Sequence, residues 1–290
     1  MWEDEYDTGL ESLSILRSAR YHLYTIWLFT FSDMKTILFP TSIWGLFNAL
    51  SGPCMTTNNH PVTTEILCRI PLVILWVWLQ LLPFNINNQR RPEAIAEDSV
   101  NKPWRPLVAG RLSPSQATYL MCAILVLDFL VSFLLQGFLP CLAMFFLGHV
   151  YNYLGGADNI MTRNLINGLG FQAFGWGATL VASNSPKYSL NQTSALLFSL
   201  LGVVVLTTVQ SQDMHDQEGD QNRGRRTLPL VIGDGPARWT LAIGVIIWSF
   251  YCPFMSREVY WTDATANCYR IVTYQLRYCL RAWRKWQRSD

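Results

Sequence analysis

The chain has 290 residues, half of them hydrophobic and 14% charged, with a net charge of +2 and a mean hydropathy of +0.17. Soluble domains carry about 25% charged residues, so this composition favours a membrane protein. The small net charge, without a basic stripe interleaved with aromatics, argues against a nucleic-acid partner, and seven scattered cysteines without a CxxC pair predict neither a disulfide framework nor a zinc site.

The first 35 residues precede the long apolar stretches. Residues 1–7 are acidic and lack the basic-then-apolar order of a cleaved signal peptide. The aromatic-rich segment from Tyr21 to Phe31 ends at a polar Ser32-Asp33-Met34-Lys35 sequence. We predict an interfacial helix here, with Trp27 and the tyrosines at the depth of the lipid headgroups.

Seven apolar segments follow, and a transmembrane helix needs about 20 mostly apolar residues. The segments are 36–51, 66–84, 116–136, 138–154, 165–183, 195–210 and 238–255. We therefore predict an all-α fold, a polytopic transmembrane helical bundle over residues 36–255. A polar, basic tail occupies 256–290.

The basic residues predict the orientation of the bundle. With a cytosolic N-terminus, the connections after the second, fourth and sixth segments hold ten Lys and Arg residues, whereas the opposite connections hold only Arg69 and Lys187. This pattern places two polar clusters at the cytosolic side. The seven basic residues of the tail conflict with it, because an odd number of spans leaves them outside. Either the tail interacts with the membrane or the number of spans differs by one.

The later cluster contains Asp213, Asp216 and Asp220, spaced i, i+3 and i+7, and then Arg223 and Arg225. On a helix these acids share one face and repel each other unless cations neutralise them. Mg²⁺ suits this arrangement, because it takes one or two carboxylates together with phosphate oxygens and water. The arginines supply charge for a diphosphate, and Gly219 and Gly224 allow the backbone to turn. A solvated, charged helix end is the alternative.

The earlier cluster is less regular. Pro92 separates an element ending at Asn88-Gln89 from one carrying Glu97, Asp98 and Asn101, and Lys102 and Arg105 follow. Alone, this pattern is equally typical of a basic loop. Its likeness in position to the later cluster favours a shared metal site.

These residues carry a resemblance. The first signature of the UbiA superfamily of intramembrane prenyltransferases resembles the sequence Glu97-Asp98-x-x-Asn101-Lys102-Pro103-x-Arg105-Pro106-Leu107, which Asn88 precedes. The second signature of this superfamily is similar to Asp213-x-x-Asp216-x-x-Gly219-Asp220 with Gly224-Arg225. Tyr151-Asn152 and Arg163-Asn164-x-x-Asn167 match the middle segment more loosely. The likeness covers roughly residues 30–240. The Asn88-Gln89 form resembles a fungal branch that includes UbiA-type sesquiterpene cyclases.

The resemblance implies a helical membrane bundle around a cytosol-facing cavity that binds an isoprenyl diphosphate through Mg²⁺. The implied metal ligands are Glu97, Asp98, Asp213, Asp216 and Asp220. The implied substrate contacts are Asn88, Asn101, Lys102, Arg105, Asn152, Arg163, Asn164, Asn167, Arg223 and Arg225. We expect the four aspartates among the ligands and Tyr151 to be catalytic, with Tyr151 or His149 removing a proton from the final cation.

Two departures from the family pattern stand out. The first signature has a longer interval after its Asn, and only Glu97 and Asp98 remain acidic. The family commonly has nine spans, whereas residues 256–290 are too polar to supply the last two. Either the bundle lacks its last helices or its C-terminus is aberrant.

Our leading hypothesis is a Mg²⁺-dependent terpene cyclase of the endoplasmic reticulum membrane that converts farnesyl diphosphate to a sesquiterpene hydrocarbon. Tailoring enzymes acting on the product are the expected partners, with the lipid bilayer. The alternatives are prenyl transfer to an aromatic or quinone-precursor acceptor and, in another class, a transporter or a non-catalytic scaffold. Asp128, within an apolar segment, is either functional or a structural group that forms an interhelical hydrogen bond or packs as a protonated acid.

Overall fold

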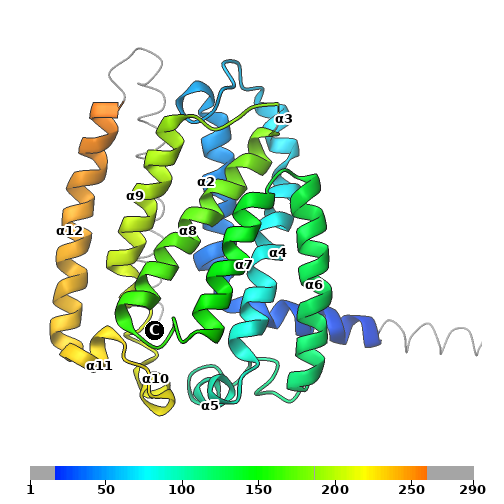
Figure 1. Cartoon of the computed structure of the whole chain (residues 1–290), viewed down its shortest axis with the longest axis vertical. Coiled ribbons are helices and arrows are strands. Elements are labelled where there is room, and N and C mark those ends of the chain that lie inside the picture. The colour runs from blue at the N-terminus through cyan, green and yellow to red at the C-terminus, as the bar shows by residue number, and fades with distance from the viewer. Residues whose placement is uncertain (1–16, 186, 260–290) are drawn as a thin grey trace, which may run out of the picture.

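Helices make up nearly all of the regular structure. The computed structural model describes residues 17–185 and 187–259, and within these ranges the only β-type pairings are two isolated bridges, Thr56 with Leu190 and Asn159 with Arg226. The predicted all-α bundle is therefore confirmed (Figure 1). The acidic residues 1–16 and most of the basic tail lie outside the described residues.

Each of the seven apolar segments forms a helix. They are α2 (Phe39–Leu50), α4 (Ile70–Gln89), α6 (Pro114–Leu134), α7 (Phe138–Tyr153), α8 (Ile160–Ser183), α9 (Gln192–Thr208) and α12 (Asp234–Val259). Among the described residues, four helical stretches are long and apolar enough to cross a membrane by themselves: α4, α6, α9 with its extension to Ser211, and α12. With 12 and 16 residues, α2 and α7 are shorter than the 18 residues that this criterion requires.

The centre of the bundle is α4, which packs against α2, α6, α7 and α8, whereas α12 lies at the outer edge against α9 (Figure 1). Trp76 of α4 is fully buried. A Cβ atom on Gly137 or Gly177 would collide with its indole ring, so these two glycines make room for it. The indole Nε1 donates a hydrogen bond to Ser132 Oγ at 2.9 Å, which satisfies its polar atom inside the core.

A second polar contact network ties α4, α6 and α7 together. Asp128 is 3% exposed, and its Oδ1 accepts hydrogen bonds from Gln80 Nε2 at 2.5 Å and Ser132 Oγ at 3.2 Å. The Cys141 thiol lies 3.6 Å from Asp128 Oδ2. Asp128 is thus an interhelical hydrogen-bonding group, the second of the two roles that the sequence left open.

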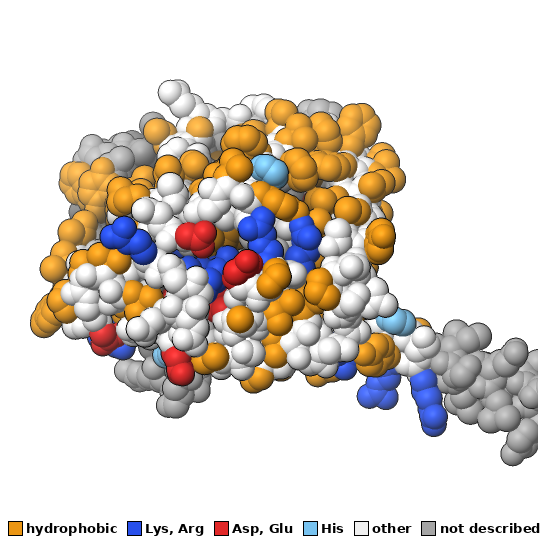
Figure 2. Space-filling view, turned by 60° about the horizontal axis from the view of Figure 1, so that its bottom comes forward, with side chains coloured by type: hydrophobic (Ala, Val, Ile, Leu, Met, Phe, Trp, Pro, Cys, Tyr) orange, Lys and Arg blue, Asp and Glu red, His pale blue; other side chains and the backbone are white. Residues whose placement is uncertain are grey.

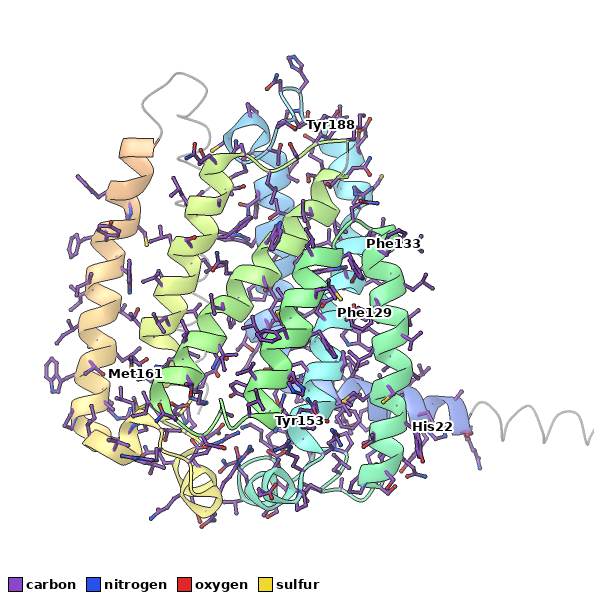
Figure 3. All side chains as sticks on the ribbon, viewed as in Figure 1. His22, Phe129, Phe133, Tyr153, Met161 and Tyr188 are labelled. Carbon is purple, nitrogen blue, oxygen red and sulfur yellow. The ribbon has the colours of Figure 1, made fainter. Side chains whose placement is uncertain are left out.

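Short helices cap the two ends of the bundle. At one end lie α5 (Pro92–Asn101), α10 (Gln217–Arg223) and α11 (Leu228–Ile232), and at the other lies α3 (Thr63–Cys68) (Figure 1). Figure 3 shows Tyr153 at the first end and Tyr188 at the second. We call the end with α5 and α10 the polar end.

The N-terminal helix, whose described part is residues 17–30, crosses the bundle near the polar end (Figure 1). It joins α2 through a 3-10 turn at Phe31–Asp33 (η1) and a π-helical turn at Met34–Leu38 (η2), so the predicted span at 36–51 begins in irregular helix. Two further 3-10 turns occur at Gly52–Cys54 (η3) and Val209–Ser211 (η4). Such irregular turns inside helices often accompany functional sites.

Candidate functional site

The earlier polar cluster forms the short helix α5. Pro92 occupies its first turn, where a missing N–H removes no hydrogen bond, so the chain turns at Arg91 and starts anew. Glu97 and Asp98 are buried on this helix. Arg105 Nη1 donates to both Asp98 oxygens, at 2.7 and 2.9 Å, from the loop that follows.

The later cluster departs from its predicted geometry. Asp213 lies in a turn after η4, and α10 begins only at Gln217, with Asp216 at its N-cap and Asp220 inside it. The prediction that the three acids share one helical face is therefore wrong. Adjacent carboxylates on one stripe repel each other, and here separate cations hold them apart: Arg163 of α8 pairs with Asp213, and Lys102 pairs with Asp216.

The glycines of this cluster have different roles. Gly224 ends α10 with a φ of +76°, the left-handed conformation expected of a turning glycine. Gly219 instead lies inside α10, and a Cβ there would collide with the Asn101 side chain of α5. Gly219 thus allows two helices to approach closely, which corrects its predicted turning role.

The two clusters meet in space, because α5 packs on α10. Arg225 Nη1 donates to Glu97 Oε1 at 2.8 Å and to Asp220 Oδ1 at 3.0 Å, so one guanidinium joins an acid from each cluster. Arg223 Nη1 donates to Glu97 Oε2 at 2.9 Å. Lys102 Nζ lies 2.6 Å from Asp216 Oδ2. Figure 2 shows acidic and basic side chains gathered on this face, within a rim of hydrophobic ones.

These ten side chains form what we call the charge network. Its acids are Glu97, Asp98, Asp213, Asp216 and Asp220, and its cations are Lys102, Arg105, Arg163, Arg223 and Arg225. Five carboxylates are thus matched by five cations. Most of these groups are buried, and buried charges persist only when paired in this way.

Burial weakens the acidity of the network. Loss of water raises the pKa of Asp213 from 3.8 to about 6, an effect that the Arg163 charge opposes and the neighbouring Asp220 charge enhances. Burial likewise raises the pKa of Asp98, against the opposing charge of Arg105, and that of Asp220, against Arg225. Added positive charge would therefore be favoured here.

The network fits Mg²⁺ only together with a ligand that supplies further oxygens. Within the described ranges, no three His, Cys, Asp or Glu side chains form a ready metal cage. Asp220 Oδ2 is buried without a hydrogen-bond partner, and Asp213 Oδ1 contacts Arg163 without hydrogen-bond alignment. Mg²⁺ commonly binds one or two carboxylates plus phosphate oxygens, so these acceptors suit it.

The predicted middle-segment residues lie beside the network. Tyr151 is 7% exposed and lies close to Arg163 and Arg225. Its ring centroid lies 5.5 Å from that of Phe84. His149 is exposed and stacks on Tyr153, away from this position.

The predicted amides are less directly engaged. Asn152 Nδ2 and Asn167 Nδ2 donate to backbone oxygens of their own helices, of Gly148 and Arg163 respectively. Asn164 is half-buried one turn before Asn167. Asn88 Oδ1 is buried near the end of α4 without a hydrogen-bond partner. This last atom is an available acceptor, and Asn167 is linked to the network residue Arg163 through that residue's backbone oxygen.

Asp33, which no sequence motif predicted, also lies beside the charge network. Its Oδ2 accepts a hydrogen bond from Asn85 Nδ2 at 2.8 Å. Burial raises the pKa of Asp33, and the nearby charges of Arg105 and Lys102 partly oppose this effect. The junction of η1 and η2 turns Asp33 toward α4. No spacing in the sequence links it to either cluster, since its partners lie on distant segments.

Comparison with known proteins agrees with this geometry. The model of the UbiA prenyltransferase family matches residues 38–289. The chain belongs to this family. Fumagillin β-trans-bergamotene synthase of Aspergillus fumigatus is 31% identical over 228 residues, covering 78% of this chain and 73% of that protein. Somaliensene A/B synthase of Streptomyces somaliensis is 30% identical, covering 80% and 73%.

A solved UbiA homologue from Archaeoglobus fulgidus, bound to GPP and Mg²⁺, superposes with a TM-score of 0.59 at 18% identity and covers 85% of each chain. This likeness confirms the fold. The chain is thus an integral membrane enzyme of the UbiA type, in the class of terpene synthases and prenyltransferases. The family match also extends into the tail that sequence analysis set apart.

Proposed function

We propose that this UbiA enzyme ionises a linear isoprenyl diphosphate, farnesyl diphosphate, and cyclises its hydrocarbon chain to a sesquiterpene with release of diphosphate. The observation that carries the proposal is the joining of Glu97 and Asp220 by Arg225 at the polar end. Acids and guanidiniums from two distant segments thereby surround one position. The terpene synthases among its relatives support the cyclase over other chemistries.

The balance of charges supports the need for Mg²⁺. Five cations already neutralise the five acids of the charge network, so a diphosphate arriving alone would find no spare positive charge. The acids of the network would hold the metal, with Asp213 and Asp220 offering oxygens that lack hydrogen bonds. Bound there, Mg²⁺ neutralises the leaving diphosphate.

With Mg²⁺ held by the acids, the cations of the network would be free to bind the diphosphate. Lys102, Arg105, Arg223 and Arg225 would donate to its oxygens as the C–O bond breaks and its electron pair leaves with the diphosphate. Asn88, Asn101, Asn152, Arg163, Asn164 and Asn167 are the further contacts to the substrate.

Tyr151 is the candidate for the last step. It lies within the core beside Phe84, close to Arg163 and Arg225. We propose its phenolic oxygen as the acceptor of the proton lost when the final carbocation becomes an alkene.

The catalytic unit that we propose is the bundle of residues 36–255, with the flanking segments 1–35 and 256–290 outside it. We place the polar end on the cytosolic side of the endoplasmic reticulum membrane. Arg90, Arg105, Arg163 and Arg225 are among the many basic residues at this end, whereas Arg69 and Lys187 lie at the other. The product would pass to tailoring enzymes.

The test is incubation of membranes containing the chain with farnesyl diphosphate and Mg²⁺ alone, followed by gas chromatography and a diphosphate assay. We expect a cyclic hydrocarbon and diphosphate in equal amounts. Asp213→Ala with Asp216→Ala should abolish both while the protein still inserts. Glu65→Ala, an exposed acid on α3 at the opposite end, serves as the control and should retain activity.

Transfer of the prenyl group to an aromatic or quinone-precursor acceptor is the second candidate, because the family as a whole is named for prenyl transfer. The same incubation separates the two. A requirement for an added acceptor contradicts the cyclase and supports transfer. Mg²⁺-independent turnover, or full activity of the double variant, contradicts both.

A further inference from the structure

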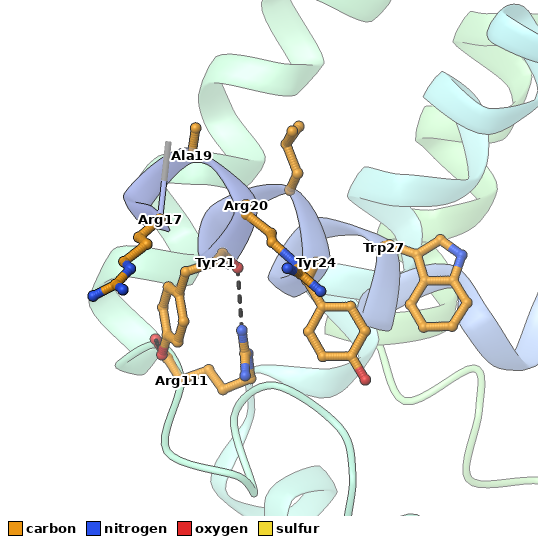
Figure 4. Close-up of a pocket in the computed structure, with 8 residues that line it drawn as sticks. Arg17, Ala19, Arg20, Tyr21, Tyr24, Trp27 and Arg111 are labelled. Atoms are coloured by element: carbon orange, nitrogen blue, oxygen red, sulfur yellow. Dashed lines mark hydrogen bonds between the residues drawn. The ribbon is translucent and has the colours of Figure 1, made fainter. Parts of the chain in front are cut away.

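A groove runs along the N-terminal helix, apart from the charge network. It encloses about 800 Å³ and lies between this helix and the loop that follows α5 (Figure 4). Its lining residues are Arg17, Ala19, Arg20, Tyr21, Leu23, Tyr24, Trp27 and Arg111. The lining thus combines three guanidiniums with three aromatic rings and contains no acidic residue.

Arg111 is the fixed element of this groove. Its Nε donates to Thr25 Oγ1 at 2.9 Å and its Nη2 donates to the Tyr21 carbonyl oxygen at 3.1 Å. Its guanidinium carbon lies 4.1 Å from the ring centroid of Tyr21 and 5.1 Å from that of Tyr24. Two faces of the guanidinium are therefore ordered by the N-terminal helix, and its charge is held in the groove.

The charge of the groove is unbalanced. Within the described ranges, no carboxylate forms an ion pair with Arg17, Arg20 or Arg111. This contrasts with the charge network, in which each cation has an acid. Three close guanidiniums without a counter-ion attract an anion with several oxygens.

The position of the groove indicates the kind of anion. The N-terminal helix crosses the lower part of the bundle, near the polar end, and extends past α6 (Figure 1). Tyr21, Tyr24 and Trp27 are between 38% and 50% exposed. Exposed aromatics beside arginines, on a helix lying along the surface, are typical of the lipid headgroup layer.

We propose that this groove binds the headgroup of an anionic phospholipid. The phosphate and carboxylate oxygens of phosphatidylserine would accept from Arg17, Arg20 and Arg111. The upper acyl chain would lie against Trp27. The proposal is independent of the proposed reaction, because none of these residues belongs to the charge network.

The test uses the full chain in nanodiscs of phosphatidylcholine that contain increasing fractions of brominated phosphatidylserine or brominated phosphatidylcholine. Bromine quenches nearby tryptophan, and subtracting the signal of Trp27→Phe isolates Trp27. We expect phosphatidylserine to quench Trp27 at a several-fold lower fraction than phosphatidylcholine. Each basic residue near an anionic surface contributes about fivefold in affinity. Arg17→Gln with Arg20→Gln should therefore remove most of this preference, so that the two lipids quench Trp27 at similar fractions.

Two variants control for charge and for folding. Arg17→Lys with Arg20→Lys keeps the charge and should keep most of the preference. Arg226→Gln with Arg238→Gln removes two exposed cations elsewhere at the polar end and should leave it unchanged. Arg111 is left intact, because it also holds the loop to the helix.

Several results would overturn the proposal. Equal quenching by the two lipids in the unmodified chain, or an equal loss in the Arg226 and Arg238 control, would mean that no specific site exists. Displacement by excess inorganic phosphate would mean a site for a free anion. If replacing Glu3, Asp4, Glu5, Asp7 and Glu11 by their amides reveals a preference that the unmodified chain lacks, the acidic N-terminal segment itself is the occupant.

Discussion

Lys102 and Asp216 form an ion pair with an N–O distance of 2.6 Å, although 114 residues separate them in the chain. Lys102 follows α5 and Asp216 precedes α10, so the pair connects the two polar clusters at their edges. Together with Arg225 at the centre, it makes both clusters one electrostatic unit. A substitution in either cluster should therefore change the electrostatic environment of the other.

Replacing Arg225 by Lys tests the centre of this unit. The guanidinium is buried and its Nη1 donates to two acids, whereas a lysine ammonium is more strongly hydrated and is therefore more costly to bury at this position. We expect turnover to fall at least about tenfold, and Arg225→Gln to destabilise the fold by about 3–5 kcal/mol. Thermal unfolding in detergent and product formation measure these effects. Arg238→Lys, in an exposed pair, is the control, and an equal effect there contradicts the interpretation.

Gly219→Ala tests the close approach of α5 and α10. The new Cβ would collide with the Asn101 side chain, which separates the helices and lowers both stability and turnover. Asn101→Ala should restore the stability of Gly219→Ala, because it removes the atoms in collision. Gly235→Ala, with open space around it, should be neutral or stabilise α12 by up to about 1 kcal/mol. Normal stability of Gly219→Ala alone would refute the steric explanation.

The pKa of Asp213 predicts a pH dependence of stability. Because burial raises this pKa from 3.8 to about 6, the folded protein retains a proton that the unfolded chain releases. Without Mg²⁺, stability should fall as pH rises from 3.8 to about 6, by on the order of 3 kcal/mol. Asp213→Asn should flatten this part of the profile. Asp98 and Asp220 act in the same direction, so the difference between the two profiles is the measured quantity, and its absence contradicts the prediction.

Asp128 offers a prediction about the core. Asp128→Asn keeps an oxygen that accepts from Gln80 and Ser132, so we expect little change in the unfolding temperature. Asp128→Leu leaves those donors unpaired in the core and should destabilise by about 1–3 kcal/mol. Turnover per folded molecule should remain similar in both. A complete loss of activity in a folded Asp128→Asn protein would instead give Asp128 a chemical role.

The seven bundle helices could be predicted because each is a long apolar stretch, and their observed ends differ from the predicted ones by at most five residues. The start of α5 at Pro92 and the turn at Gly224 also follow from local residue properties. Such features depend on neighbouring residues in the chain.

The local geometry around Asp213 and Asp216 could not be predicted in this way. The spacing of the acids favours a continuous helix, yet Arg163 and Lys102 come from distant segments and hold each acid separately. The same reason explains Asp33, whose neighbours Asn85, Lys102 and Arg105 converge only after folding. Interactions between distant segments overrode the local pattern.

The match of five acids with five cations also bears on how ligands enter. A lone metal ion must compete with guanidiniums that already occupy the carboxylates, and a lone pyrophosphate must compete with the carboxylates for the guanidiniums. In the proposed function, the resting ion pairs would therefore disfavour either ligand by itself and would favour the two together. Reforming these pairs would in turn favour release of the diphosphate product.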